Sequence, residues 1–265
     1  MAAPYPQIVL FGDSIARGAA TTLDGFSLQS ALQTHCIRRL DVINRGLGGY
    51  NTSQALHVLP TLFPLPAAAK LTHLVVLFGA NDAALPQQTD NQHVPLDEYE
   101  RSLTSILTHP NIRAHSPKII LVTPPPLNGF HLGQIHRLAD PNAATSRQAK
   151  VTAQYAEAAR RVAKTVPGVE LVDLWTALMD HAVKNTPDWG LSSGVLLGDE
   201  QDENSQQGYL SKLLTDGLHL TGEGYRIFWE ELRPHIELPP NAEESTEGFV
   251  VPDWKVAPWL AAKKE

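Results

Sequence analysis

Short runs rich in Val, Ile and Leu recur along the chain, and longer segments with helical spacing separate them. Runs that are apolar at consecutive positions predict strands buried on both faces, as in a parallel sheet covered by helices on each side. The five runs lie at residues 8–11, 41–44, 72–78, 118–122 and 170–173. A chain of this kind is expected to alternate β and α elements around one central sheet.

The segments between these runs predict helices at residues 26–40, 96–107 and 144–166. The first of them would place Cys36 and Ile37 on its apolar face. Alternating strands and helices imply right-handed crossovers. The predicted fold is therefore a three-layer αβα sandwich with a parallel sheet of about five strands.

Two segments depart from this regular pattern. Residues 188–213 contain an acidic, polar run and predict an insertion loop, mobile at least over residues 199–207. Residues 239–265 form a tail with Trp254 and Trp259, which we expect to pack on the domain or on a partner subunit. Residues 1–238, which include the insertion loop, are predicted to form one domain.

The charge and the amino-acid composition exclude several classes of binding partner and cellular location. The formal net charge is −7 and no Lys/Arg cluster is present, so nucleic acid is not an expected partner. The single cysteine, Cys36, excludes an internal disulfide, fits a reducing compartment and is interpreted as a small core residue. No secretory signal and no apolar run of membrane-spanning length is visible, so we expect a cytoplasmic protein without membrane insertion.

Polar motifs follow the first three predicted strands. Gly12, Asp13 and Ser14 form a short loop where a serine would be held at a helix N-terminus, although the same tripeptide also suits a plain turn or helix cap. Residues 44–49 form a glycine-rich loop that lets a backbone N–H approach a ligand. Asn81 offers an amide donor suited to an oxyanion, or an Asx-turn that holds its loop.

A fourth motif lies near the end of the predicted domain. Asp216 and His219 stand three residues apart on a loop that leads into a helix, so the carboxylate can orient the imidazole. His131 and His136 form the only other histidine pair of note, and their spacing without a Cys or Glu ligand makes a metal site improbable. The four motifs together predict a serine hydrolase.

The chain resembles the GDSL, or SGNH, hydrolases, which have a flavodoxin-like αβα fold. Residues 8–18 (IVLFGDSIARG), 44–52 (NRGLGGYNT), 78–82 (FGAND) and 216–225 (DGLHLTGEGY) match its sequence blocks. Within that family the chain is most similar to the isoamyl acetate-hydrolysing esterases. The likeness covers residues 8 to 236 and departs from the family in the insertion loop and the tail.

The resemblance implies a nucleophile, Ser14, activated by His219 and Asp216. It also implies an oxyanion hole formed by the backbone N–H groups of Ser14 and Gly49 and by the amide of Asn81. Gly48, beside Gly49, remains an alternative donor. The implied reaction needs neither a metal nor an organic cofactor.

The substrates implied are small carboxylic esters, with acetates of medium-chain alcohols first. Carbohydrate acetyl esters and lysophospholipid or thioester substrates remain alternatives on the same residues, and a non-catalytic binding module is the alternative of another class. A homodimer is left open. Six apolar residues are candidates for the pocket rim, and at least half of them are expected to lie in the core. They are Leu47, Tyr50, Leu127, Phe130, Leu196 and Leu197.

Overall fold

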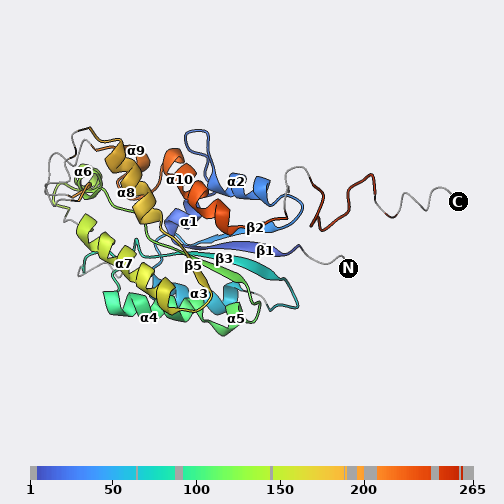
Figure 1. Cartoon of the computed structure of the whole chain (residues 1–265). Helices are drawn as coiled ribbons and strands as arrows, with labels where there is room; N and C mark the ends of the chain where they lie inside the picture. The colour runs from blue at the N-terminus through green and yellow to red at the C-terminus, as the bar shows by residue number, and fades with distance from the viewer. Residues whose placement is uncertain are drawn as a thin grey trace.

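A computed structural model describes residues 5–63, 65–86, 92–143, 146–187, 189, 196–199, 208–239, 245–256 and 258. Five parallel strands form one sheet in the order β2-β1-β3-β4-β5 (Figure 1). All five predicted strands are present, and their ends move by two residues at most. They are β1 (Gln7–Gly12), β2 (Asp41–Gly46), β3 (Leu71–Leu77), β4 (Lys118–Val122) and β5 (Val169–Val172).

Helices cover both faces of the sheet, which confirms the predicted three-layer sandwich (Figure 1). Successive strand residues point to opposite faces, so Ile8 and Leu10 pack with one helical layer and Val9 and Phe11 with the other. The first layer contains α1 (Ser14–Gly18), α2 (Leu28–His35), α8 (Leu174–Lys184), α9 (Leu210–Leu213) and α10 (Gly222–Leu232). The second contains α3 (Thr52–Leu62), α4 (Leu96–Leu107), α5 (Pro110–Arg113) and α7 (Ala149–Thr165).

Two further helical segments complete the described chain. Helix α6 (Gly129–Ala139) lies at the same end of the molecule as α9, and a short 3₁₀ turn at Arg233–His235 follows α10 (Figure 1). None of the helices in the described ranges has both the length and the apolar character needed to cross a bilayer.

Two predicted helices are shorter than expected. The helix predicted at 26–40 ends at His35 because the chain turns there, and Arg38 adopts a φ of +64°. Ile37, predicted on its apolar face, lies beyond that end and is 61% exposed, whereas Cys36 is fully buried as expected. The helix predicted at 144–166 begins at Ala149, after an extended segment that contains Arg147.

Part of the predicted insertion loop packs into the hydrophobic core. Within it, Leu197 and the α9 residues Leu210 and Leu213 are buried against the first helical layer. Asp199, at the start of the stretch expected to be mobile, is buried and its carboxylate lies 2.9 Å from the Lys150 ammonium. Residues 188, 190–195 and 200–207 lie outside the described residues.

Part of the predicted tail contacts the end of α2. The guanidinium groups of Arg38 and Arg39 lie 4.2 and 4.6 Å from the centre of the Phe249 ring, and Arg39 also donates to tail carbonyls. Trp254 is 70% exposed. Trp259, the other aromatic residue singled out in the tail, lies outside the described residues.

Candidate active site

The strand order fixes where a ligand site can form. In a 2-1-3-4-5 sheet the strand order reverses at β1, because β2 lies on one side of it and β3 on the other. Ligands bind outside the carboxyl ends of the strands at such a point. Ser14 follows β1 after one residue, and Asn81 lies in the loop after β3. Gly49 lies in the loop after the neighbouring strand β2. Three of the sequence motifs therefore meet at one edge of the sheet.

Local packing places Ser14 at the first position of α1. Asp13 caps this helix, and its Oδ1 accepts a hydrogen bond from the Ile15 N–H at 2.8 Å. Gly12 is required before it, because a Cβ there would lie 2.3 Å from the Leu77 carbonyl oxygen. Asp13 is fully buried, and this burial raises its pKa to about 7. Asp13 therefore braces the loop that carries Ser14.

A tight loop before α10 presents the second half of the site. Its ends pair through a bridge between Leu214 and Leu220, and Gly217 adopts a φ of +88° that favours glycine. The Oδ1 atom of Asp216 accepts the backbone N–H groups of Leu218 and His219 at 2.9 and 2.8 Å. These bonds hold the carboxylate in place beside Nδ1 of the imidazole.

Ser14, His219 and Asp216 form one hydrogen-bonded chain. The distance from Asp216 Oδ2 to His219 Nδ1 is 2.6 Å, and His219 Nε2 lies 2.9 Å from Ser14 Oγ. A carboxylate only accepts hydrogen bonds, so Nδ1 carries the imidazole proton and Nε2 is free to accept the Ser14 hydroxyl. The fold brings together residues that are 205 positions apart.

The electrostatic setting keeps Asp216 ionised. Burial alone would raise the pKa of its carboxyl. The hydrogen bonds from the His219 ring and from the backbone N–H groups of His219 and Leu218 outweigh that effect, so the pKa of Asp216 lies well below its ordinary value. The ionised Asp216 carboxylate is therefore the acceptor for the His219 ring.

Besides Ser14, the other two predicted oxyanion donors, Gly49 and Asn81, also lie in this region. Gly49 has a φ of +83°, and its carbonyl oxygen accepts a hydrogen bond from Gln92 Nε2 at 3.0 Å. Asn81 is 3% exposed, and its Nδ2 donates to the Tyr50 carbonyl oxygen at 2.9 Å. An amide nitrogen carries two hydrogens, so one remains for another acceptor. The alternative donor Gly48 lies under Arg17, whose Nη1 would be 2.7 Å from a Cβ at that position.

The six candidate rim residues differ in exposure. Leu127 and Leu197 are 1% exposed and present almost no surface to a ligand. Leu47 and Tyr50 are partly exposed and pack against the core between the sheet and the second helical layer. Phe130 and Leu196 are also partly exposed. The structure thus buries two of the six, where at least half were expected in the core.

Three residues at the site had no role assigned from the sequence. Arg147 and Gln92 hydrogen-bond to the oxyanion candidates, and Tyr225 donates to the carbonyl of Ile15 in α1. Tyr225 falls inside the block 216–225, and this position could have drawn attention to it. Arg147 and Gln92 lie in irregular segments, where no local pattern reveals a long-range contact.

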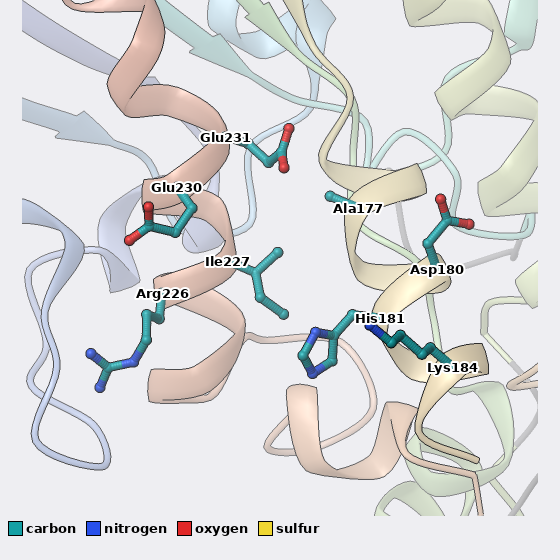
Figure 2. A pocket seen from close by; sticks show the side chains of 8 residues that line it. All are labelled: Ala177, Asp180, His181, Lys184, Arg226, Ile227, Glu230 and Glu231. Atoms are coloured by element: carbon teal, nitrogen blue, oxygen red, sulfur yellow. The ribbon is translucent and has the colours of Figure 1, made fainter. Parts of the chain in front are cut away.

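A groove elsewhere in the described chain is separate from this site. In the described ranges no group of three or more His, Cys, Asp or Glu side chains is arranged to hold a metal ion. A groove of about 480 Å³ runs between α8 and α10 (Figure 2). Charges of both signs line it, and it shares no residue with the Ser14 site. The lining residues are Ala177, Asp180, His181, Lys184, Arg226, Ile227, Glu230 and Glu231.

Comparison with solved structures supports the fold. A lipase/acylhydrolase from Enterococcus faecalis superposes with a TM-score of 0.57 at 21% identity, over 88% of this chain and 97% of its own. The acetylxylan esterase Axe2 from Geobacillus stearothermophilus superposes with a TM-score of 0.58 at 18% identity, over 89% and 96%. At these identities the likeness establishes the architecture alone.

Comparison with known sequences establishes the family. A GDSL esterase/lipase of Arabidopsis thaliana is 34% identical over 86% of this chain and 84% of its own length. The human isoamyl acetate-hydrolyzing esterase 1 homolog is 30% identical over 95% of this chain and 88% of its own. The sequence model of the GDSL-like Lipase/Acylhydrolase family matches residues 10–227. This chain therefore belongs to the GDSL-like lipase/acylhydrolase family and is a carboxylic ester hydrolase.

Proposed function

We propose that the protein is a serine esterase that works through an acyl-enzyme formed on Ser14. The observation that carries this proposal is the hydrogen-bonded chain from Asp216 through His219 to Ser14, with distances of 2.6 and 2.9 Å. Nucleophile, base and orienting carboxylate are within hydrogen-bonding reach, as nucleophilic catalysis requires.

In the first step, Ser14 Oγ attacks the ester carbonyl carbon while His219 Nε2 accepts its proton. The tetrahedral intermediate then collapses: the C–O bond to the alcohol breaks, and His219 returns the proton to the departing oxygen. Water repeats the sequence on the acyl-enzyme, with His219 as base, and releases the carboxylic acid. Asp216 keeps the imidazole in the required tautomer throughout.

The negative charge of the tetrahedral intermediate is held by three donors in this proposal. They are the backbone N–H groups of Ser14 and Gly49 and the second hydrogen of Asn81 Nδ2. Each donor of this kind is typically worth ~3 kcal/mol of barrier. The position of Ser14 at the start of α1 and the left-handed φ of Gly49 support this assignment.

We propose small, uncharged esters as substrates, with acetates of medium-chain alcohols first. Support comes from the isoamyl acetate-hydrolyzing esterase 1 homologs. The human protein is 30% identical to this chain over 95% of the chain's length. The partly exposed side chains of Leu47, Tyr50, Phe130 and Leu196 would supply an apolar rim.

The proposal is tested by hydrolysis of p-nitrophenyl acetate and by fluorophosphonate labelling of the wild type and Ser14→Ala. The wild type should turn over and label, and the variant should do neither. Equal activity in both proteins would show that Ser14 is not the nucleophile. Turnover of isoamyl acetate compared with acetylated sugars and acyl-CoA then identifies the substrate class, and a rate maximum at long acyl chains would contradict the short-acyl proposal.

A further inference from the structure

A buried arginine lies behind the proposed oxyanion hole. Arg147 is 7% exposed and precedes α7, where the Ser146 carbonyl accepts the Leu85 N–H at 2.8 Å and ties this segment to the loop after β3. The Arg147 Nε donates to the Ala80 carbonyl at 3.1 Å, and its Nη2 donates to Asn81 Oδ1 at 3.0 Å. One guanidinium therefore holds both the backbone and the side chain of this loop.

The contact with Arg147 decides which way the Asn81 amide faces. A guanidinium has donors but no acceptor, so it can only face the amide oxygen of Asn81. The nitrogen must then point the other way, where it donates to the Tyr50 carbonyl. A cation on the oxygen also polarises the amide and strengthens its N–H donors.

Through Gln92, the same guanidinium is also connected to the loop that contains Gly49. Arg147 Nη2 donates to Gln92 Oε1 at 2.7 Å, and Gln92 Nε2 donates to the Gly49 carbonyl at 3.0 Å. Arg147 fixes the Gln92 amide just as it fixes that of Asn81. The Gly49 and Tyr50 carbonyls are thus held from two sides, by Gln92 and by Asn81.

We propose that Arg147, acting through Asn81 and Gln92, is a positioning residue that sets the Asn81 and Gly49 oxyanion donors before substrate arrives. This inference depends on the oxyanion roles of Gly49 and Asn81 proposed above. Donors fixed in advance need no reorganisation as charge develops, which is the main source of their catalytic effect. Arg147 itself touches no reacting atom in this scheme.

The test measures kcat and KM for p-nitrophenyl acetate in Arg147→Met, Arg147→Lys and Gln92→Met. Loss of an interaction felt only in the transition state lowers kcat and leaves KM nearly unchanged. We expect Arg147→Met to lose about 10- to 100-fold in kcat, less than the ~10²–10³-fold loss for deleting a donor. Arg147→Lys, which keeps the charge but not the planar fork, should recover part of the loss.

A double-mutant cycle separates positioning from general destabilisation. If Arg147 acts in part through Asn81, Arg147→Met should cost less kcat in an Asn81→Ala background than in the wild type, because only the contact through Gln92 to Gly49 is then left to lose. Fully additive losses would overturn the inference, as would a loss seen in KM instead of kcat. If Asn81→Ala leaves kcat unchanged while Ser14→Ala abolishes it, the proposed oxyanion hole is itself wrong and the role of Arg147 falls with it.

Arg39→Met is the matched control, because Arg39 is a 5% exposed arginine that also donates to backbone carbonyls, at the tail. It should reduce thermal stability and leave kcat unchanged. An equal fall in kcat in both arginine variants would overturn the inference. If Arg147→Met does not fold, Gln92→Met provides the test, because Gln92 is partly exposed. An unchanged kcat in Gln92→Met would contradict the proposed positioning of Gly49 through Gln92.

Discussion

The Tyr225 hydroxyl donates a hydrogen bond to the Ile15 carbonyl at 2.8 Å, across 210 residues of sequence. Ile15 follows the proposed nucleophile in α1, and Tyr225 lies in α10. Their contact joins α1, which carries Ser14, to the helix that directly follows the His219 loop. Burial raises the pKa of Tyr225 above its ordinary value, so the hydroxyl keeps its proton and remains a donor.

Tyr225→Phe should therefore destabilise the protein by about 1–3 kcal/mol, because it leaves a buried carbonyl without its partner. Urea denaturation measures the change. Tyr209→Phe is the control, since the Tyr209 hydroxyl bonds Glu223 at a partly exposed position and its loss should cost less. Equal losses of unfolding free energy in the two variants would show that the buried contact with Ile15 stabilises the protein no more than the partly exposed one with Glu223.

Asp216→Asn should lower kcat by about 10³- to 10⁴-fold while the fold stays intact. The amide can donate to Nδ1, which places the imidazole proton on Nε2 and blocks acceptance of the Ser14 proton. Steady-state kinetics with p-nitrophenyl acetate measure the loss, and circular dichroism checks the fold. A loss of less than about tenfold would contradict the orienting role assigned to Asp216.

Gly46→Ala should impair activity by moving α1. A Cβ at Gly46 would lie 2.0 Å from the backbone nitrogen of Arg17, so the helix that carries Ser14 must shift. A displacement of about 1 Å at a reacting group can cost ~10²-fold in rate. Gly133→Ala is the control, because its Cβ meets only the flexible end of Arg137 at 3.1 Å and an alanine favours helix α6. A rate in Gly46→Ala equal to that of the control would contradict this coupling.

The buried Asp13 carboxyl predicts a pH dependence of stability. Burial raises its folded pKa to about 7 from the ordinary value of 3.8, so between these values the folded state binds more protons than the unfolded state. Stability therefore falls as pH rises from about 4 to about 7 and levels off above that. The fall should be on the order of a few kcal/mol at most.

Denaturant unfolding of the wild type and Asp13→Asn at pH 5, 6 and 7.5 measures this effect. The variant keeps a capping side chain but cannot ionise, so its stability should change less over this range. Some slope should remain, because burial also raises the pKa of Asp82, to about 6. Parallel curves for the two proteins would show that Asp13 does not titrate in this window.

Much of the fold could be predicted because the relevant physics is local. A strand buried on both faces must be apolar at consecutive positions, and the runs at 72–78 and 118–122 show this directly. The order of motifs after successive strands then placed Ser14 and Asn81 at one edge of the sheet. Helix ends were less predictable: α2 stops at His35 because of a turn that includes the positive φ of Arg38, and apolar spacing continues past it.

By itself, then, the sequence determined the sandwich, its strands and the residue types of the site, since periodicity and short motifs encode them. Only the tertiary structure decided the 2.9 Å approach of His219 to Ser14 and the burial of Asp13. It alone placed Arg147 behind Asn81. These contacts join segments far apart in the chain, and no local pattern specifies which polar side chain will meet which backbone group once the core has packed.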